Sequence, residues 1–114
     1  GKPQERIYDV AWSGNRRIDP RTGKLPAVGN TVDLKTGAYT NTIGAAELSA
    51  VWSDPDFKAD QAAVYYVRVL EIPTPRWSTL RAIEHGLPLP QNVPPTLQQR
   101  AWTSPIWFTP SRRR

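Results

Sequence analysis

The 114-residue chain contains neither cysteine nor methionine, and it has a single histidine. Without cysteine it has no disulfide framework, no thiolate zinc site, no iron–sulfur cluster and no cysteine nucleophile, so composition leaves the cellular compartment open. A chain of this length holds one domain at most, which excludes a large multi-step enzyme. Because the initiator methionine is missing, we expect the sequence to begin inside a longer gene product.

Long apolar runs are also missing, and no stretch approaches the roughly 18 residues that predict a membrane span. The net charge of +5 is uneven: residues 1–60 carry eight basic and eight acidic residues, and residues 61–114 carry seven and two. Three of the surplus charges are Arg112–Arg114, which we interpret as a solvated tail (111–114) after a single domain, 1–110. Nucleic-acid binding needs basic residues spaced along a folded face, so a nucleic-acid partner is the less favoured interpretation.

Alternating hydrophobicity and closely spaced turn residues predict an all-β fold. We expect a five- to six-stranded antiparallel sandwich-like domain or small barrel, with one short helix and long proline-rich loops. The helix is expected over Thr79–His85, with Ser78 as its N-cap and Leu80 and Ile83 in its buried stripe. The expected strands are 6–12, 31–34, 38–43, 47–52, 63–72 and 101–109.

The stretch 63–72 is apolar on both of its faces, which predicts a central strand covered on both sides. Arg68 interrupts it, and a buried guanidinium would need a carboxylate such as Asp9 or Glu47. In the last strand Pro105 cannot donate to a ladder, so we expect an edge strand or a bulged one there.

Pro73-Thr74-Pro75 ends the central strand and gives Arg76 and Trp77 a rigid setting, facing either a ligand or a neighbouring domain. We expect Trp12, Trp52 and Trp102 to pack in the core by alternation, whereas Trp77 and Trp107 fit that pattern less well. The candidate ligand or interdomain contact residues are Arg68, Glu71, Arg76, Trp77 and Trp107.

No residue of the chain is predicted to be catalytic or to bind a metal. His85 stands alone at a predicted helix end, where an imidazolium favours the helix dipole. Asp54, Asp56 and Asp60 lack the glycine and terminal glutamate of a calcium loop, so a turn is the favoured interpretation. We therefore expect no cofactor in this chain.

Five segments carry a family resemblance: 5–13, 29–33, 40–44, 66–77 and 100–107. The longest reads Tyr-Val-Arg-Val-Leu-Glu-Ile-Pro-Thr-Pro-Arg-Trp. Over about 1–110 the chain resembles the C-terminal end of the bacterial family catalogued as domain of unknown function 3604. Members look like PHP-type metallohydrolases in their N-terminal and central parts, with Gly-Asp-x-His-x-His motifs that do not occur here.

The resemblance implies that the divalent metal belongs to an N-terminal catalytic-like domain that this chain lacks, and that this domain is its partner. It also implies a periplasmic or secreted setting, because members often begin with an export signal. The leading hypothesis is thus a non-catalytic β domain that packs on the catalytic domain and shapes its site. The alternative is a stand-alone binding module for a carbohydrate or anionic ligand through Arg76 and Trp77. A homo-oligomer is a further way to cover an open sheet edge.

Overall fold

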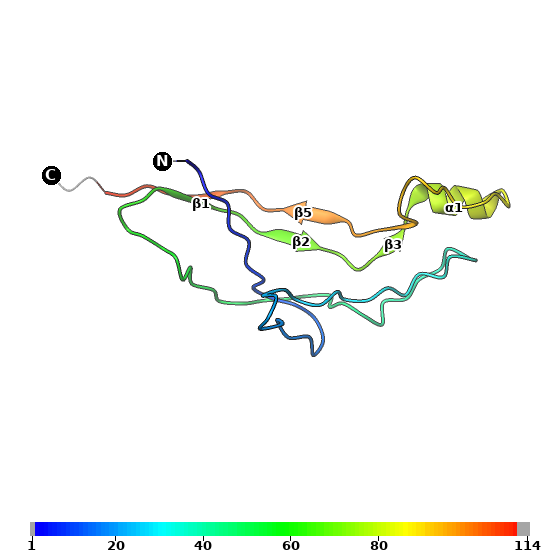
Figure 1. Ribbon diagram of the computed structural model, residues 1–114, viewed down its shortest axis with the longest axis horizontal. Coiled ribbons are helices and arrows are strands. Elements are labelled where there is room, and N and C mark those ends of the chain that lie inside the picture. Colours follow the sequence, from blue (N-terminus) through cyan, green and yellow to red (C-terminus); the bar gives the residue numbers. More distant parts are fainter. Residues whose placement is uncertain (1, 112–114) are drawn as a thin grey trace.

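Residues 63–75 pair with residues 96–108 and form a long antiparallel ribbon, shown in Figure 1. A short helix and the proline-rich connection, residues 87–95, join the two stretches. The computed structural model describes residues 2–111, so the predicted tail Arg112–Arg114 lies outside the described residues. The ribbon contains three two-stranded sheets, β1 with β6, β2 with β5 and β3 with β4. The strands are β1 (Ala63–Tyr65), β2 (Arg68–Leu70), β3 (Thr74–Pro75), β4 (Thr96–Leu97), β5 (Arg100–Trp102) and β6 (Ile106–Phe108).

The first interruption of the ribbon is a β-bulge at Pro105. Between the pairs Tyr65–Ile106 and Arg68–Trp102, two residues of one strand face three of the other. Proline has no N–H for the ladder, and the hydroxyl of Thr103 accepts the N–H of Val67 at 2.9 Å in place of a carbonyl. The predicted bulge is therefore confirmed.

A second bulge, of opposite sense, lies at Pro73. Glu71 donates its N–H to the carbonyl of Gln99, and Thr74 pairs with Leu97, so Ile72 and Pro73 together face one residue. The side chain of that residue, Gln98, donates to the carbonyl of Glu71 at 2.8 Å. Because the extra residue lies on opposite strands in the two bulges, the pairing of β3 with β4 has the same register as the pairing of β1 with β6.

The helix α1 (Trp77–Glu84) begins two residues earlier than predicted, after the extended residue Arg76 and not after Ser78. Thr79 is the most deeply buried residue of the helix. It is 1% exposed and donates its hydroxyl to the carbonyl of Pro95 at 2.8 Å. This bond ties the first turn of the helix to the proline-rich connection. The buried residues of α1 are Thr79 and Ala82, whereas the predicted stripe residue Leu80 stays exposed.

Below the ribbon runs a layer of extended chain, roughly residues 12–53, in which no strand is assigned (Figure 1). The chain turns between the predicted strands 31–34 and 38–43, where Asp33 donates its N–H to the carbonyl of Ala38 at 2.8 Å. Farther from the turn, the hydroxyl of Thr31 accepts the N–H of Thr40 in place of a ladder bond. No strand is assigned over 6–12, 31–34, 38–43 or 47–52 in the described chain, so the prediction of regular strands there is wrong.

Two glycines with positive φ let the lower layer approach the ribbon and the helix. Gly44, at φ +82°, leaves only enough room for the side chain of Ile72, because a Cβ there would lie 2.6 Å from Ile72 Cγ2. A Cβ on Gly37, at φ +75°, would lie 2.7 Å from Leu80 Cδ2. Both the backbone conformation and the close contact favour glycine at these points.

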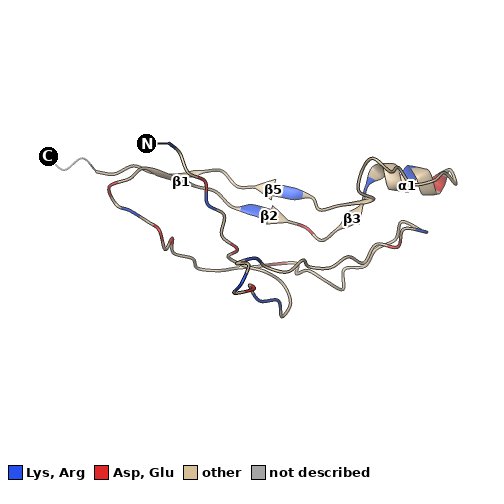
Figure 2. Cartoon of the chain, viewed as in Figure 1, with Lys and Arg blue, Asp and Glu red and all other residues tan. Residues whose placement is uncertain are grey.

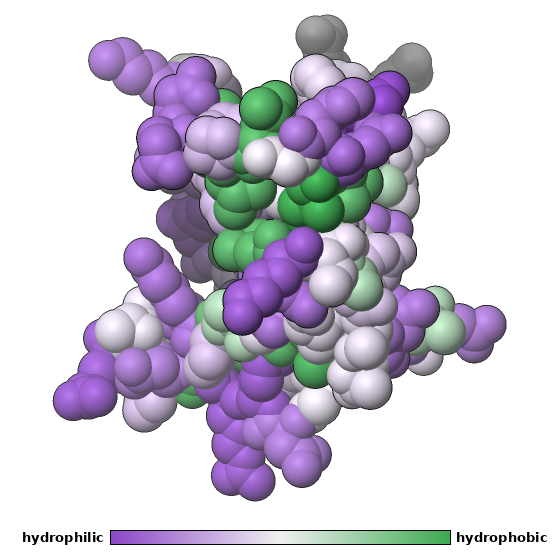
Figure 3. Space-filling model, turned by 90° about the vertical axis from the view of Figure 1, so that its right-hand side faces the viewer, coloured by the Kyte–Doolittle hydropathy of each residue, from purple (hydrophilic) through white to green (hydrophobic). Residues whose placement is uncertain are grey.

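The two layers enclose almost no core. Among the described residues only Ser13, Thr79 and Ala82 are buried, and the molecule measures 70 × 29 × 27 Å. Its radius of gyration is 19.4 Å, against about 13 Å for a compact domain of this length. Viewed from the α1 end, Figure 3 shows apolar side chains open to solvent between the upper and lower parts.

The prediction of an antiparallel, β-rich chain with one short helix is confirmed, and the described residues form no closed barrel. The prediction of one central strand over 63–72 is wrong, because the bulge splits it and each half has a partner on one edge only. Trp52 and Trp102, expected in the core, are 40% and 59% exposed. No helix in residues 2–111 is long and apolar enough to cross a membrane.

Candidate functional site

An open groove of about 510 Å³ lies where the ribbon meets α1. It is lined by Arg76, directly before the helix, by Pro94 and β4, and by β5 with the residues leading into it. The lining residues are Arg76, Pro94, Thr96, Leu97, Gln98, Gln99, Arg100 and Trp102, and they include no carboxylate.

The pairing of β2 with β5 determines what lies beside the groove. Arg68 is opposite Trp102, and Leu70 is opposite Arg100, so these four side chains share one face of the ribbon. Figure 2 shows the basic stretches on β2, on β5 and at the start of α1. Two arginines and a tryptophan thus share this face with Leu70.

The structure divides the predicted contact residues. Arg68 and Trp107 lie on the same face of the ribbon, because Trp107 pairs with Val64, four residues before Arg68. Glu71, which continues the alternation of β2, belongs to the opposite face. Arg76 lines the groove, but its predicted companion Trp77 does not and is 73% exposed on α1.

Arg68 is exposed and makes no ion pair with Asp9, Glu47 or any other residue in the described range, so the predicted internal pair is wrong. Sequence patterns missed Arg100 and the groove role of Trp102. The signal that would have found them is the pairing of 63–76 with 95–108 across the proline-rich connection. That pairing brings two arginines 24 positions apart to one groove.

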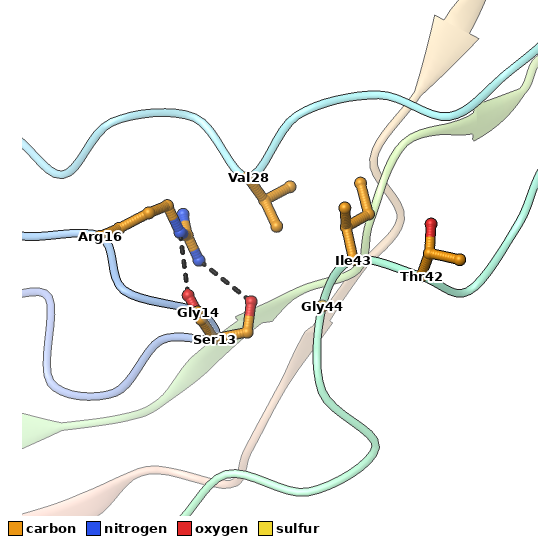
Figure 4. Close-up of a pocket in the computed structure, with 7 residues that line it drawn as sticks. All are labelled: Ser13, Gly14, Arg16, Val28, Thr42, Ile43 and Gly44. Atoms are coloured by element: carbon orange, nitrogen blue, oxygen red, sulfur yellow. Dashed lines mark hydrogen bonds between the residues drawn. The ribbon is translucent and has the colours of Figure 1, made fainter.

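A second, smaller pocket of about 190 Å³ lies in the lower layer and is shown in Figure 4. Its arginine, Arg16, donates to the carbonyl and the hydroxyl of Ser13 and to the carbonyl of Pro26. In addition, the indole of Trp12 donates to the carbonyl of Arg16 at 2.8 Å. This guanidinium holds a loop together, whereas Arg100 of the groove makes no side-chain hydrogen bond or ion pair within residues 2–111.

At the other end of the ribbon, three tyrosines hydrogen-bond to carboxylates. Tyr8 donates to Asp56, Tyr65 to Asp54 at 2.8 Å, and Tyr66 to Glu5 at 2.9 Å. The bond to a carboxylate is the main cause that raises the pKa of each tyrosine. These bonds fasten the N-terminal segment to the turn after Ser53 and to the ribbon.

Asp56 is the centre of this cluster, because Arg6 forms an ion pair with it as well. The hydrogen bond from Arg6, followed by that from Tyr8, lowers the pKa of Asp56 below its ordinary value of 3.8. A carboxylate held ionised in this way does not act as a general acid near neutral pH. The predicted turn is confirmed, since Asp54 accepts the N–H of Asp56 at 2.8 Å.

No group of three or more histidine, cysteine or acidic side chains within residues 2–111 is arranged to hold a metal ion. His85 is the C-cap of α1, as its position in the sequence indicates. The features of this chain are therefore those of a β-rich ribbon module with a basic, tryptophan-lined groove.

Comparison with known proteins places this ribbon module in a family. The chain belongs to the family described as "Protein of unknown function (DUF3604)", whose model matches residues 1–110. Searches of the curated proteins and of the solved structures find no match.

Proposed function

We propose that this chain is the non-catalytic C-terminal segment of a bacterial metallohydrolase-like protein of this family, and that it packs on the catalytic domain and shapes its site. The metal would belong to that domain. In the complete protein, the ribbon and the extended lower layer would form parts of the predicted sandwich-like arrangement. The observation that carries this proposal is the amount of surface that the chain leaves open.

The exposed surface is 10126 Å². A compact monomer of 12.8 kDa exposes about 6,300 Å². The difference between these two areas is several times the roughly 800 Å² that each partner buries in a standard protein–protein interface. Many large apolar side chains contribute to the exposed surface, among them Trp77, Ile106 and Trp107, which is typical of a surface that another part of a protein covers.

The segment 45–53 supports a covering partner independently. It is extended, it has no ladder partner in the described chain, and Val51 is 102% exposed. With its N–H and C=O groups unpaired beside exposed Leu48 and Val51, this segment could pair with a further strand. We assign that strand to the catalytic domain, with a second copy of this chain as the alternative.

The test is to compare the 114-residue chain with the complete gene product that contains it. We expect the chain alone to bind a dye for apolar surfaces and to self-associate in sedimentation, while the complete protein does neither. A chain that stays a monodisperse monomer at high concentration and binds no dye would contradict the proposal. A stable, dye-free dimer of the chain would instead favour the second copy as the covering partner.

A further inference from the structure

We propose that the groove lined by Arg76, Arg100 and Trp102 is a binding site for an acidic saccharide, whose carboxylate groups the two arginines hold and whose ring lies against the indole. This site differs from the predicted pair of Arg76 and Trp77. It does not depend on the packing role proposed above, because segment 45–53 contributes no residue to the lining of the groove.

The charge of the groove is uncompensated. Arg100 makes no side-chain hydrogen bond or ion pair in the part of the chain that the structure describes, and no carboxylate lines the groove. Two guanidinium groups at one groove repel each other unless an anion lies between them. Planar guanidinium groups pair with carboxylates through two parallel hydrogen bonds, which makes a carboxylate the matching ligand.

Arg76 is held in place for this role. Its Nε–H donates to the carbonyl of Pro94 at 3.0 Å, and its backbone N–H donates to the carbonyl of Pro95 at 3.0 Å. Pro75, directly before Arg76, and the acceptors Pro94 and Pro95 limit the backbone motion of both segments. The terminal nitrogens of the guanidinium make no bond within residues 2–111, so the cation is oriented but its ends are free. A positioned donor loses less conformational entropy when a ligand binds.

The rest of the lining favours a sugar as the carrier of the negative charge. Trp102 offers a broad apolar face and is 59% exposed, while Thr96, Gln98 and Gln99 offer hydroxyl and amide groups. Gln98 donates its amide to the carbonyl of Glu71, which leaves its Oε1 as an acceptor. A volume of about 510 Å³ is within the usual range of small-molecule sites, about 300–1,000 Å³.

The experiment is calorimetric titration of the complete protein with trigalacturonate, with neutral maltotriose as the ligand control. We expect trigalacturonate to bind, to bind more weakly as salt rises, and maltotriose to give no heat. Arg100→Ala should weaken binding about tenfold or more, since it removes a charge-assisted pair. Arg17→Ala, a change at an exposed arginine that does not line the groove, should not alter the affinity.

The tryptophan assignment has a matched control as well. Trp102→Ala should weaken binding, whereas Trp77→Ala should leave it unchanged. If Trp77→Ala has the larger effect, the site lies on α1 and the proposal is wrong. Arg100→Lys keeps the charge but removes the planar guanidinium group, which can make two parallel hydrogen bonds to a carboxylate. An affinity between those of the wild type and Arg100→Ala therefore supports carboxylate pairing.

Labelling by phenylglyoxal shows whether the groove is open in the complete protein. Arg76 and Arg100 should react in the free protein and be protected by trigalacturonate but not by maltotriose. If both are unreactive without ligand, another part of the protein covers the groove, and the proposal is wrong. Tighter binding of an oligo(dT) than of trigalacturonate would also overturn it, in favour of a nucleic acid.

Discussion

At the scale of single residues, the fold depends on two kinds of position. At some, a side chain makes the hydrogen bond that a backbone group would otherwise make, and at others a glycine leaves room for a neighbouring segment. The hydroxyl of Thr103 and the amide of Gln98 complete the ladder at the two bulges. Gly44 and Gly37 permit close contact between layers. The sequence contains closely spaced turn residues, but it gave no sign of the side chains that these two glycines touch, since those belong to segments more than 25 residues away.

Gly44→Ala should destabilise the complete protein more than Gly23→Ala does. Both glycines have positive φ, so both variants incur the same backbone strain of about 1–2 kcal/mol. Only at Gly44 does the new methyl group meet a neighbour, Ile72 Cγ2 at 2.6 Å, because nothing lies within 4 Å at Gly23. We expect an additional loss of about 1–3 kcal/mol, measured as the free energy of unfolding in denaturant. Equal losses in the two variants would show that the layers do not meet at Gly44.

At the scale of elements, local signals predicted what local chemistry decides. The short helix and the interruption at Pro105 were both expected, because capping, periodicity and the missing N–H of proline act within a few residues. The split of 63–72 could not be predicted, since the bulge depends on which residues lie opposite. For the same reason the position of Arg100 in the groove could not be predicted from the sequence. Arg76 was predicted as a contact residue, because prolines precede it.

The attachment of the N-terminal segment to the turn at Asp56 should depend on pH. Because the folded pKa of Asp56 is lowered, its contribution to stability is present above pH 3.8 and is lost as the pH falls through the folded pKa. Tyr8, Tyr65 and Tyr66 have raised folded pKa values, so their contribution is complete below pH 10 and is lost as the pH rises further. The midpoint of unfolding in denaturant, followed across this range, measures both effects.

Asp56→Asn should reduce the acid-dependent part of this profile, and Asp60→Asn is the matched control. Asp60 is exposed and accepts no side-chain hydrogen bond from any residue in 2–111. We expect the control to follow the wild type between pH 3 and 6, by the ordinary titration range of carboxylates. An Asp56→Asn profile identical to that of the wild type would show that the N-terminal segment is held by other contacts.

At the scale of the whole molecule, the chain is an open ribbon over an extended layer, with apolar side chains on both. The composition of the sequence indicated a small β-rich domain, and it did not reveal that this domain would lack a core. Core formation depends on how many apolar faces meet, and periodicity describes each face separately. Segment 45–53 illustrates this, because its alternation is typical of a half-buried strand while no residue of the described chain pairs with it.

Amide hydrogen exchange of segment 45–53 tests the central claim most directly. We measure it in the 114-residue chain and in the complete gene product under the same conditions. We predict unprotected amides at Leu48–Val51 in the chain alone and strong protection in the complete protein, because a strand of the catalytic domain then pairs with this edge. Equally fast exchange in both would contradict the claim that another part of the protein covers this chain.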